Sequence, residues 1–202
     1  MKINKTNARK YLTEGNAKLS NEIAIWSVIA KKEVCGMVCK GCYAIKAQNG
    51  RHGKSITPSR ERKYSFSQSN EFIDTILASI VKLDKKYVRI HESGEFYSQE
   101  YINKWCYIAT SLPGVTFVAY TKRLKDFDFS ILKGLENVII IDSLHGGKIN
   151  FGSILDKPKD ALICPAYTAK NADFGCLRGC DLCYKRENKS KLEARGLYFV
   201  QH

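Results

Sequence analysis

The chain has 202 residues and a formal net charge of +13, because 33 lysines and arginines outnumber 20 aspartates and glutamates. Apolar residues make up 44% of it, which excludes a disordered chain. No apolar stretch reaches the roughly eighteen residues that a membrane helix needs. The N-terminus lacks the apolar run of a secretion signal, so we expect a cytoplasmic protein without a membrane partner.

The length suits a single domain over residues 1–202. Within it we distinguish a polar, loosely held lead-in (1–20), an α/β core with a first cysteine group (21–160), and a second cysteine group with the C-terminal segment (161–202). The oligomeric state is left open by the sequence.

Predicted elements alternate along the chain between strands and helices. We expect a buried strand within 22–30, loop with at most one helical turn over 48–68, and a helix over 71–83 capped by Ser69 or Asn70. Strands are expected at 86–90, 114–121, 136–143 and 160–164. Between them lie a helix from a Ser98 cap to about Thr110 and a short helix or turn over 125–135. Residues 192–200 fit either a helix end or a closing strand.

This alternation predicts an α/β fold with a parallel sheet, either open or curved into a partial, trimmed TIM-like barrel. Polar and cysteine-rich segments follow the predicted strands. Because the carboxyl ends of parallel strands meet at one edge of a sheet, we expect these segments to converge on one rim.

Seven of the eight cysteines fall into two groups. The first has the spacing C-x3-C-x2-C and consists of Cys35, Cys39 and Cys42. The second has the spacing C-x11-C-x3-C-x2-C and consists of Cys164, Cys176, Cys180 and Cys183. In a reducing compartment such clusters indicate metal binding rather than disulfides. Cys106 stands alone in a predicted helix and is expected to be a buried structural thiol.

The spacing of the first group favours iron over zinc, because zinc sites usually pair one C-x2-C motif with a distant second one. Three cysteines can hold three irons of a cubane 4Fe–4S cluster and leave the fourth iron open, whereas the four cysteines of the second group could fully coordinate either a second cluster or one Zn²⁺. We therefore expect one or two 4Fe–4S clusters. The alternative metal is Zn²⁺, for which His52 would complete a Cys3His site with the first group.

The strand followed by C-x3-C-x2-C, together with the later turn "ESGEF", resembles the radical S-adenosylmethionine (SAM) enzymes. The resemblance implies an open-iron cluster on the first cysteine group, to which SAM binds. It also implies that the turn containing Gly94 and Glu95 contacts the SAM amino group and that Thr121 and Lys122, in "AYTKR", lie near the ribose or substrate. His91 and Glu95 are the candidate catalytic side chains. One departure is Gly41, which stands where that family has an aromatic residue.

The segments "GNAKLS", "RIHESGEFYSQEYINKW" and "AYTK", with the last cysteine cluster, resemble the phage and mobile-element family called gene product eighty-eight. That resemblance implies a phage or plasmid origin and no established activity. The leading hypothesis is a radical-SAM-like enzyme in which a 5′-deoxyadenosyl radical abstracts hydrogen from a nucleotide or nucleic acid. The alternative is a non-catalytic, metal-stapled protein that binds nucleic acid or a host nucleoprotein, such as a phage inhibitor of host defence.

The positive charge bears on both hypotheses, because basic proteins favour nucleic acid or another polyanion as partner. The alternative reading is a well-solvated surface. Basic residues gather after the first cysteine group (Lys46, Arg51, Lys54, Arg60, Arg62, Lys63) and around the last one (Arg178, Lys185, Arg186, Lys189, Lys191, Arg195).

Overall fold

The computed structural model describes residues 3–36, 39, 42–143, 159–165 and 175–198. At its centre is a five-stranded sheet in the order β1-β2-β3-β4-β5. The strands are β1 (Thr13–Glu14), β2 (Ile23–Trp26), β3 (Tyr87–Ile90), β4 (Thr116–Thr121) and β5 (Val138–Asp142). β1 is antiparallel to β2, and the other neighbours are parallel, with Trp26 opposite Ile90 and Thr121 opposite Asp142. The predicted parallel α/β sheet is confirmed, but in the described part of the chain it does not close into a barrel.

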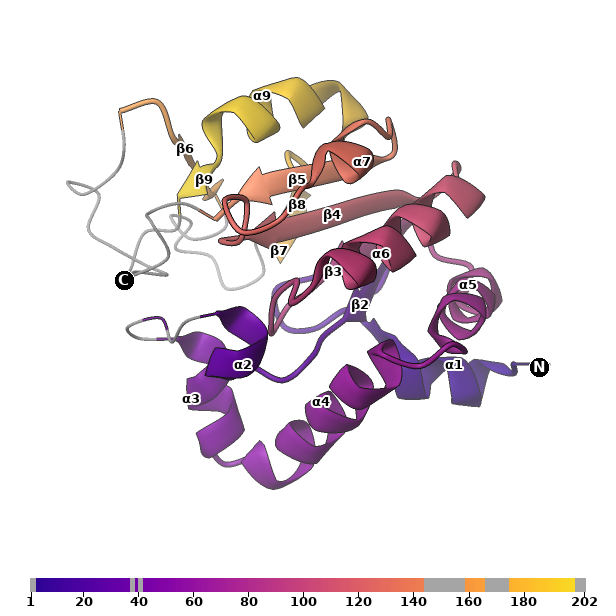
Figure 1. Ribbon diagram of the computed structural model, residues 1–202. Coiled ribbons are helices and arrows are strands. Elements are labelled where there is room, and N and C mark those ends of the chain that lie inside the picture. Colours follow the sequence, from indigo (N-terminus) through magenta and orange to yellow (C-terminus); the bar gives the residue numbers. More distant parts are fainter. Residues whose placement is uncertain (1–2, 37–38, 40–41, 144–158, 166–174, 199–202) are drawn as a thin grey trace.

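Helices cover one face of the sheet. They are α1 (Lys5–Tyr11), α2 (Lys32–Cys35), α3 (Tyr43–Asn49), α4 (Gly53–Ser67), α5 (Phe72–Leu83), α6 (Gln99–Ser111) and α7 (Ser130–Lys133). Because side chains alternate along a strand, Trp26, Ile90 and Phe117 point to the helical face, where they pack with Phe72 and Trp105 into the main core. Figure 1 shows α1, α4, α5 and α6 on this side of the sheet.

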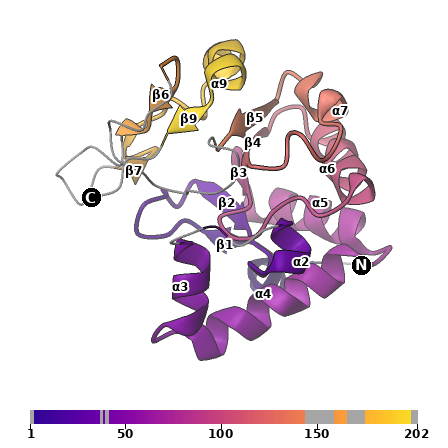
Figure 2. The ribbon, with the colours of Figure 1, turned by 60° about the vertical axis from the view of Figure 1, so that its left-hand side comes forward.

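The C-terminal segment covers the opposite face. It contains β6 (Leu162–Ile163), β7 (Gly175–Cys176), β8 (Gly179–Cys180), a 3-10 turn (Arg186–Asn188), α9 (Lys189–Arg195) and β9 (Leu197–Tyr198). A second core joins Ile25, Val118 and Ile139 of the sheet to Cys183 and Leu192 of this segment. β6 pairs with β9 and β7 with β8, so these strands form small sheets of their own. Figures 1 and 2 show α9, β6 and β9 on the other side of the sheet from α4, α5 and α6.

The two longer predicted helices, α5 and α6, are both present. α6 begins where the sequence predicted, and α5 does not. α6 begins after Ser98, whose Oγ accepts a hydrogen bond from the Tyr101 backbone N–H, so the predicted cap is confirmed. α5 begins at Phe72 after Glu71, which makes no side-chain capping bond. The prediction of Ser69 or Asn70 as its cap was therefore wrong.

The prediction of a loop over 48–68 was also wrong, because α4 occupies fifteen of those residues. The helix has no continuous apolar stripe, so helical periodicity could not identify it. It buries instead Arg60, Lys63 and Ser67, and the Arg60 guanidinium donates to the carbonyl oxygen of Ala44. Its stability comes from tertiary contacts that are invisible in the local sequence.

The lead-in is structured rather than loosely held. Ala8 of α1 and the following Leu12 are completely buried. Further on, the backbone N–H of Cys176 donates to the carbonyl oxygen of Lys18, and the N–H of Ser20 donates to that of Cys176. The N-terminal residues 16–20 are thereby tied to the second cysteine group.

Buried Asn137 holds the connection between α6 and β4. Its Nδ2 lies 2.9 Å from the carbonyl oxygen of Ala109 and 3.1 Å from those of Leu112 and Val115. We expect Asn137→Ala to lower the free energy of unfolding by about 2 kcal/mol and Tm by roughly 4–8 °C, because it leaves carbonyl groups unpaired. Thermal unfolding followed by circular dichroism measures this. Asn103→Ala, an exposed change on α6, is the control and should shift Tm by little.

Candidate functional site

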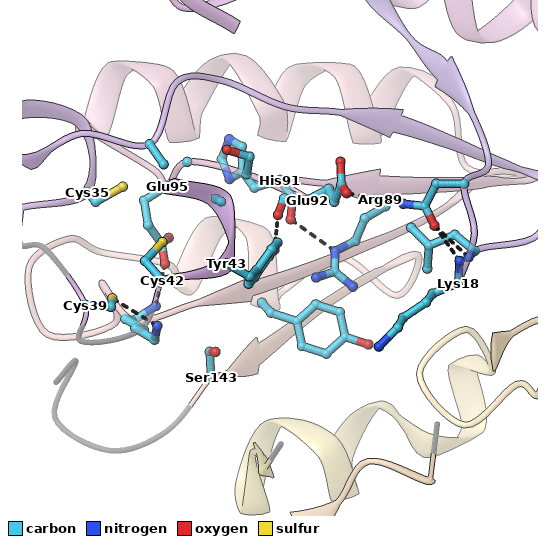
Figure 3. A pocket seen from close by; sticks show the side chains of 18 of the residues that line it. Lys18, Cys35, Cys39, Cys42, Tyr43, Arg89, His91, Glu92, Glu95 and Ser143 are labelled. Atoms are coloured by element: carbon cyan, nitrogen blue, oxygen red, sulfur yellow. Dashed lines mark hydrogen bonds between the residues drawn. The ribbon is translucent and has the colours of Figure 1, made fainter. Parts of the chain in front are cut away.

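A pocket of about 560 Å³ opens at the carboxyl ends of the parallel strands. Its walls come from the loops after β2, β3, β4 and β5, and from both cysteine groups. The residues that line it and bear on its chemistry are Asn16, Lys18, Cys35, Cys39, Cys42, Tyr43, Arg89, His91, Glu92, Gly94, Glu95, Tyr120, Lys122, Ser143, Cys164 and Cys176. The predicted convergence on one rim is thus present (Figure 3).

All three cysteines of the first group line this pocket. Cys35 is the last residue of α2, and Cys42 is the residue that precedes α3. The Nζ of Lys122, just past the end of β4, lies 3.2 Å from the Sγ of Cys39 and donates to it. Burial raises the pKa of the Cys35 thiol to about 12, and the nearby charge of Glu95 acts in the same direction.

The Gly94–Glu95 turn lies beside this group, as the sequence predicted. Gly94 adopts a φ of +82°, and the backbone there packs directly on Val28. The Glu95 carboxylate accepts hydrogen bonds from the Oγ1 of Thr121 at 2.7 Å and from the backbone N–H of Lys122 at 2.9 Å. Burial raises the pKa of Glu95 despite these bonds, which oppose the shift. Thr121 itself is fully buried and acts on the pocket through Glu95.

The ring of His91 packs away from the cysteines, between Phe96 and Tyr101. Its Nε2 lies 2.9 Å from the Tyr101 hydroxyl, which also accepts a bond from the Trp26 indole. His91 is the first residue after β3 and has a left-handed φ of 65°. This backbone conformation takes its side chain out of the alternation that a strand imposes. His91 contributes to the pocket wall, but its imidazole belongs to the aromatic core.

The burial of His91 should make stability depend on pH. Burial, reinforced by the positive charge of Arg89, lowers its pKa to about 3. Below about pH 6.5 the unfolded state therefore binds a proton on this imidazole, whereas the folded state does not. The contribution of neutral His91 to the free energy of unfolding is complete above pH 6.5 and is lost as the pH falls towards 3. The loss amounts to about 1.4 kcal/mol per pH unit.

We expect His91→Asn, which tolerates the left-handed backbone, to reduce the fall in unfolding free energy between pH 6.5 and 4. Urea unfolding at each pH measures the slope. His52→Asn is the control, because His52 is exposed. Equal slopes in the wild type and His91→Asn would contradict the assignment of a neutral, buried imidazole.

The second cysteine group borders the same pocket from the opposite face of the sheet. Cys164 and Cys176 line the pocket, whereas Cys180 and Cys183 do not. Burial raises the pKa of Cys183 to about 12, and the nearby thiols of Cys176 and Cys164 act in the same direction. The two groups, more than a hundred residues apart in the sequence, therefore face one cavity.

A metal ion or cluster would need these thiols to converge more closely. Among the residues that the structure describes, no three His, Cys, Asp or Glu side chains are gathered closely enough to hold a metal ion. Positions 37, 38, 40 and 41, within the first motif, lie outside the described residues. His52 is exposed at the start of α4 and does not line the pocket.

Cys106 is only partly buried, contrary to expectation, and its Sγ contacts the carbonyl oxygen of Ile131 at 3.6 Å.

Sequence reasoning missed Arg89 and the segment 16–19 as parts of the pocket. Arg89 interrupts the apolar strand "KYVRI", and a charged side chain in a buried strand is a signal for a special role. Asn16 and Lys18 lie far from the motifs in sequence. Their place in the wall follows from the backbone bonds between this segment and Cys176.

Comparison with known proteins decides the family. A match to the family described as gene product 88 covers residues 1–182. The chain belongs to the gene product 88 family. This confirms the resemblance to that phage family. No curated protein and no solved structure matches this gene product 88 protein, so the likeness to radical-SAM enzymes stays a prediction.

The basic residues of this gene product 88 protein divide between surface and interior. Arg51, Lys54 and Arg62 are exposed, but Arg60 and Lys63 of the same predicted group are buried. Arg60 lies 3.8 Å from Glu92. Within the described residues, no helix has the length and apolar character to cross a membrane.

Proposed function

We propose that this gene product 88 protein is an iron–sulfur enzyme of the radical-SAM type that acts on a nucleotide or nucleic-acid substrate. One observation carries the proposal. The three cysteines of the C-x3-C-x2-C motif line the same 560 Å³ pocket as Glu95 and Lys122, at the carboxyl ends of consecutive parallel strands. This matches the order of elements that the sequence resemblance implies.

The type of donor suits an iron–sulfur centre, although the described thiols would have to move closer together to hold one. Cys35, Cys39 and Cys42 supply thiols to one wall of the pocket, and thiolates are the protein ligands of iron–sulfur clusters. The Lys122 ammonium lies against this group and donates a hydrogen bond to the Sγ of Cys39. A 4Fe–4S cluster held there would supply the electron that cleaves SAM. The four cysteines of the second group are the candidates for an auxiliary cluster or Zn²⁺.

The chain itself would orient and shield the reactants. Glu95 offers a carboxylate whose direction is set by Thr121 and by the Lys122 backbone, so an ammonium group that enters the pocket meets a pre-oriented acceptor. Gly94 lets the backbone approach at that point. The C-terminal segment covers the opposite face of the sheet and contributes Cys164 and Cys176 to the pocket wall.

The test begins with anaerobic purification, followed by analysis of iron, sulfide and zinc and an absorption spectrum. The proposal predicts a brown protein with roughly four to eight irons per chain, as one or two cubanes require. Reduction with dithionite in the presence of SAM should then release 5′-deoxyadenosine, measured by mass spectrometry. A colourless protein with one or two zinc ions and no sulfide would overturn it.

A second candidate function is a non-catalytic, metal-stapled protein that binds nucleic acid or a host nucleoprotein. The net charge of +13 favours it, together with exposed cations such as Lys54, Arg178 and Lys191. Under this candidate the metals stabilise the fold and SAM has no effect. Steeply salt-dependent binding to DNA or RNA, unchanged by SAM and without 5′-deoxyadenosine formation, would favour it over the enzyme.

A further inference from the structure

Arg89 is a cation that lines the pocket and has no acidic partner among the residues that the structure describes. It lies on β3 and is partly buried, and it lines the pocket with its neighbour Tyr120. None of the ion pairs between described residues includes it. Because a guanidinium stays protonated in proteins and a buried charge without a partner is costly, this position calls for an anion.

The fixed orientation of Arg89 supports this reading. Its Nε donates to the carbonyl oxygen of His91 at 3.2 Å, and its guanidinium carbon stacks 3.6 Å from the centre of the Tyr120 ring. These contacts hold the planar group at one angle, as in sites that recognise oxyanions with two parallel hydrogen bonds. They do not neutralise its charge.

The carboxylates of the pocket are engaged elsewhere. Glu95 accepts bonds from Thr121 and Lys122. Glu92 lies 3.8 Å from Arg60 and accepts a bond from Asn16 at 3.3 Å. Figure 3 shows Arg89 on the Lys18 side of the pocket, across from Cys35, Cys39 and Glu95. Among the described residues, no carboxylate that lines the pocket therefore pairs with Arg89, and we take its counter-charge to be a bound anion.

We propose that Arg89 binds the oxyanion of a small substrate, a phosphate or a carboxylate, at the end of the pocket away from the first cysteine group. The proposal rests on the proposed function in treating this cavity as the substrate pocket, and it names the group by which the substrate is held. Tyr43, 41% exposed and also lining the pocket, offers an aromatic face for a planar ring attached to that oxyanion.

The experiment is isothermal titration calorimetry on the full chain as purified, at low salt and without SAM. The probes are inorganic phosphate, adenosine monophosphate, adenosine and succinate. We expect at least one oxyanion probe to bind, and Arg89→Gln to weaken it about ten- to hundredfold, as for a lost charge-assisted contact. Arg89→Lys should retain part of the affinity. Arg62→Gln, which removes the same charge from an exposed site of α4, should change it less than about twofold.

The probes separate the sources of the anion. Binding of phosphate and adenosine monophosphate assigns a phosphate, whereas binding of succinate alone assigns a carboxylate. Binding that responds equally to Arg89→Gln and Arg62→Gln would overturn the proposal, as would the absence of binding by every oxyanion probe. The proposal would also be overturned if Arg89→Gln lost bound metal while no oxyanion probe bound the wild type. That result would indicate that Arg89 supports the second cysteine group.

Protection mapping on the wild type covers the case in which Arg89→Gln fails to fold. Phenylglyoxal modifies arginines, and a bound oxyanion should slow its reaction at Arg89 but not at Arg62, as read by peptide mass spectrometry. Equal rates at Arg89 with and without the probe would refute the site. Because neither measurement involves SAM or catalysis, failure of the anion site and failure of the proposed enzyme activity can be told apart.

Discussion

Replacing Cys39 with alanine should remove about four irons per chain, the content of one cubane, and abolish SAM cleavage. Cys39 lines the pocket and is the thiol that Lys122 contacts, so its loss removes one of three ligands from the proposed open-iron cluster. Iron and sulfide analysis after anaerobic purification, with the assay for 5′-deoxyadenosine, measures both effects.

Two further variants locate the loss. Cys106→Ala, on α6 and outside the pocket, should leave iron content and activity unchanged. Cys183→Ala should remove metal from the second group and leave SAM binding to the first intact. If Cys39→Ala keeps the full iron and sulfide content of the wild type, the first cysteine group is not the cluster site and the proposed function fails.

Replacing Gly94 with alanine should lower the free energy of unfolding by about 2–4 kcal/mol, or roughly 4–16 °C in Tm. An added Cβ would lie 2.3 Å from the Val28 Cγ2 and 2.9 Å from the Val28 carbonyl oxygen. The φ of +82° adds backbone strain for any residue with a side chain. Relief of the clash would displace the turn and with it Glu95, so SAM affinity should fall as well.

Gly114→Ala is the matched control. Gly114 is exposed, and nothing lies within 4 Å of the position that its Cβ would occupy. The change should leave Tm within about 2 °C of the wild type, as expected for surface substitutions. Thermal unfolding of both variants under one condition gives the comparison. Similar Tm values for Gly94→Ala and the wild type would contradict the prediction. They would show that Val28 and its loop can move to accommodate the added Cβ at little cost in stability.

Local sequence was sufficient for the parallel strands and for α6. β2, β3, β4 and β5 are short runs of β-branched and apolar residues bounded by polar turns, and Ser98 marks the start of α6. The cysteine spacings identified both thiol groups by local pattern. The alternation of strands and helices predicted that the "ESGEF" turn and the first group would meet at one rim, and both line the same pocket. These features follow from local patterns and their order along the chain, so they are readable without the fold.

The tertiary structure decided the rest. α4 lacks an apolar stripe and is held by buried Arg60 and Lys63, and the N-terminal residues bond to Cys176 across the chain. A left-handed φ turns His91 into the aromatic core, and strand pairing sets Arg89 on Tyr120. Each of these depends on contacts between distant segments, because burial and pairing of charged or polar side chains are determined by neighbours that sequence order does not reveal.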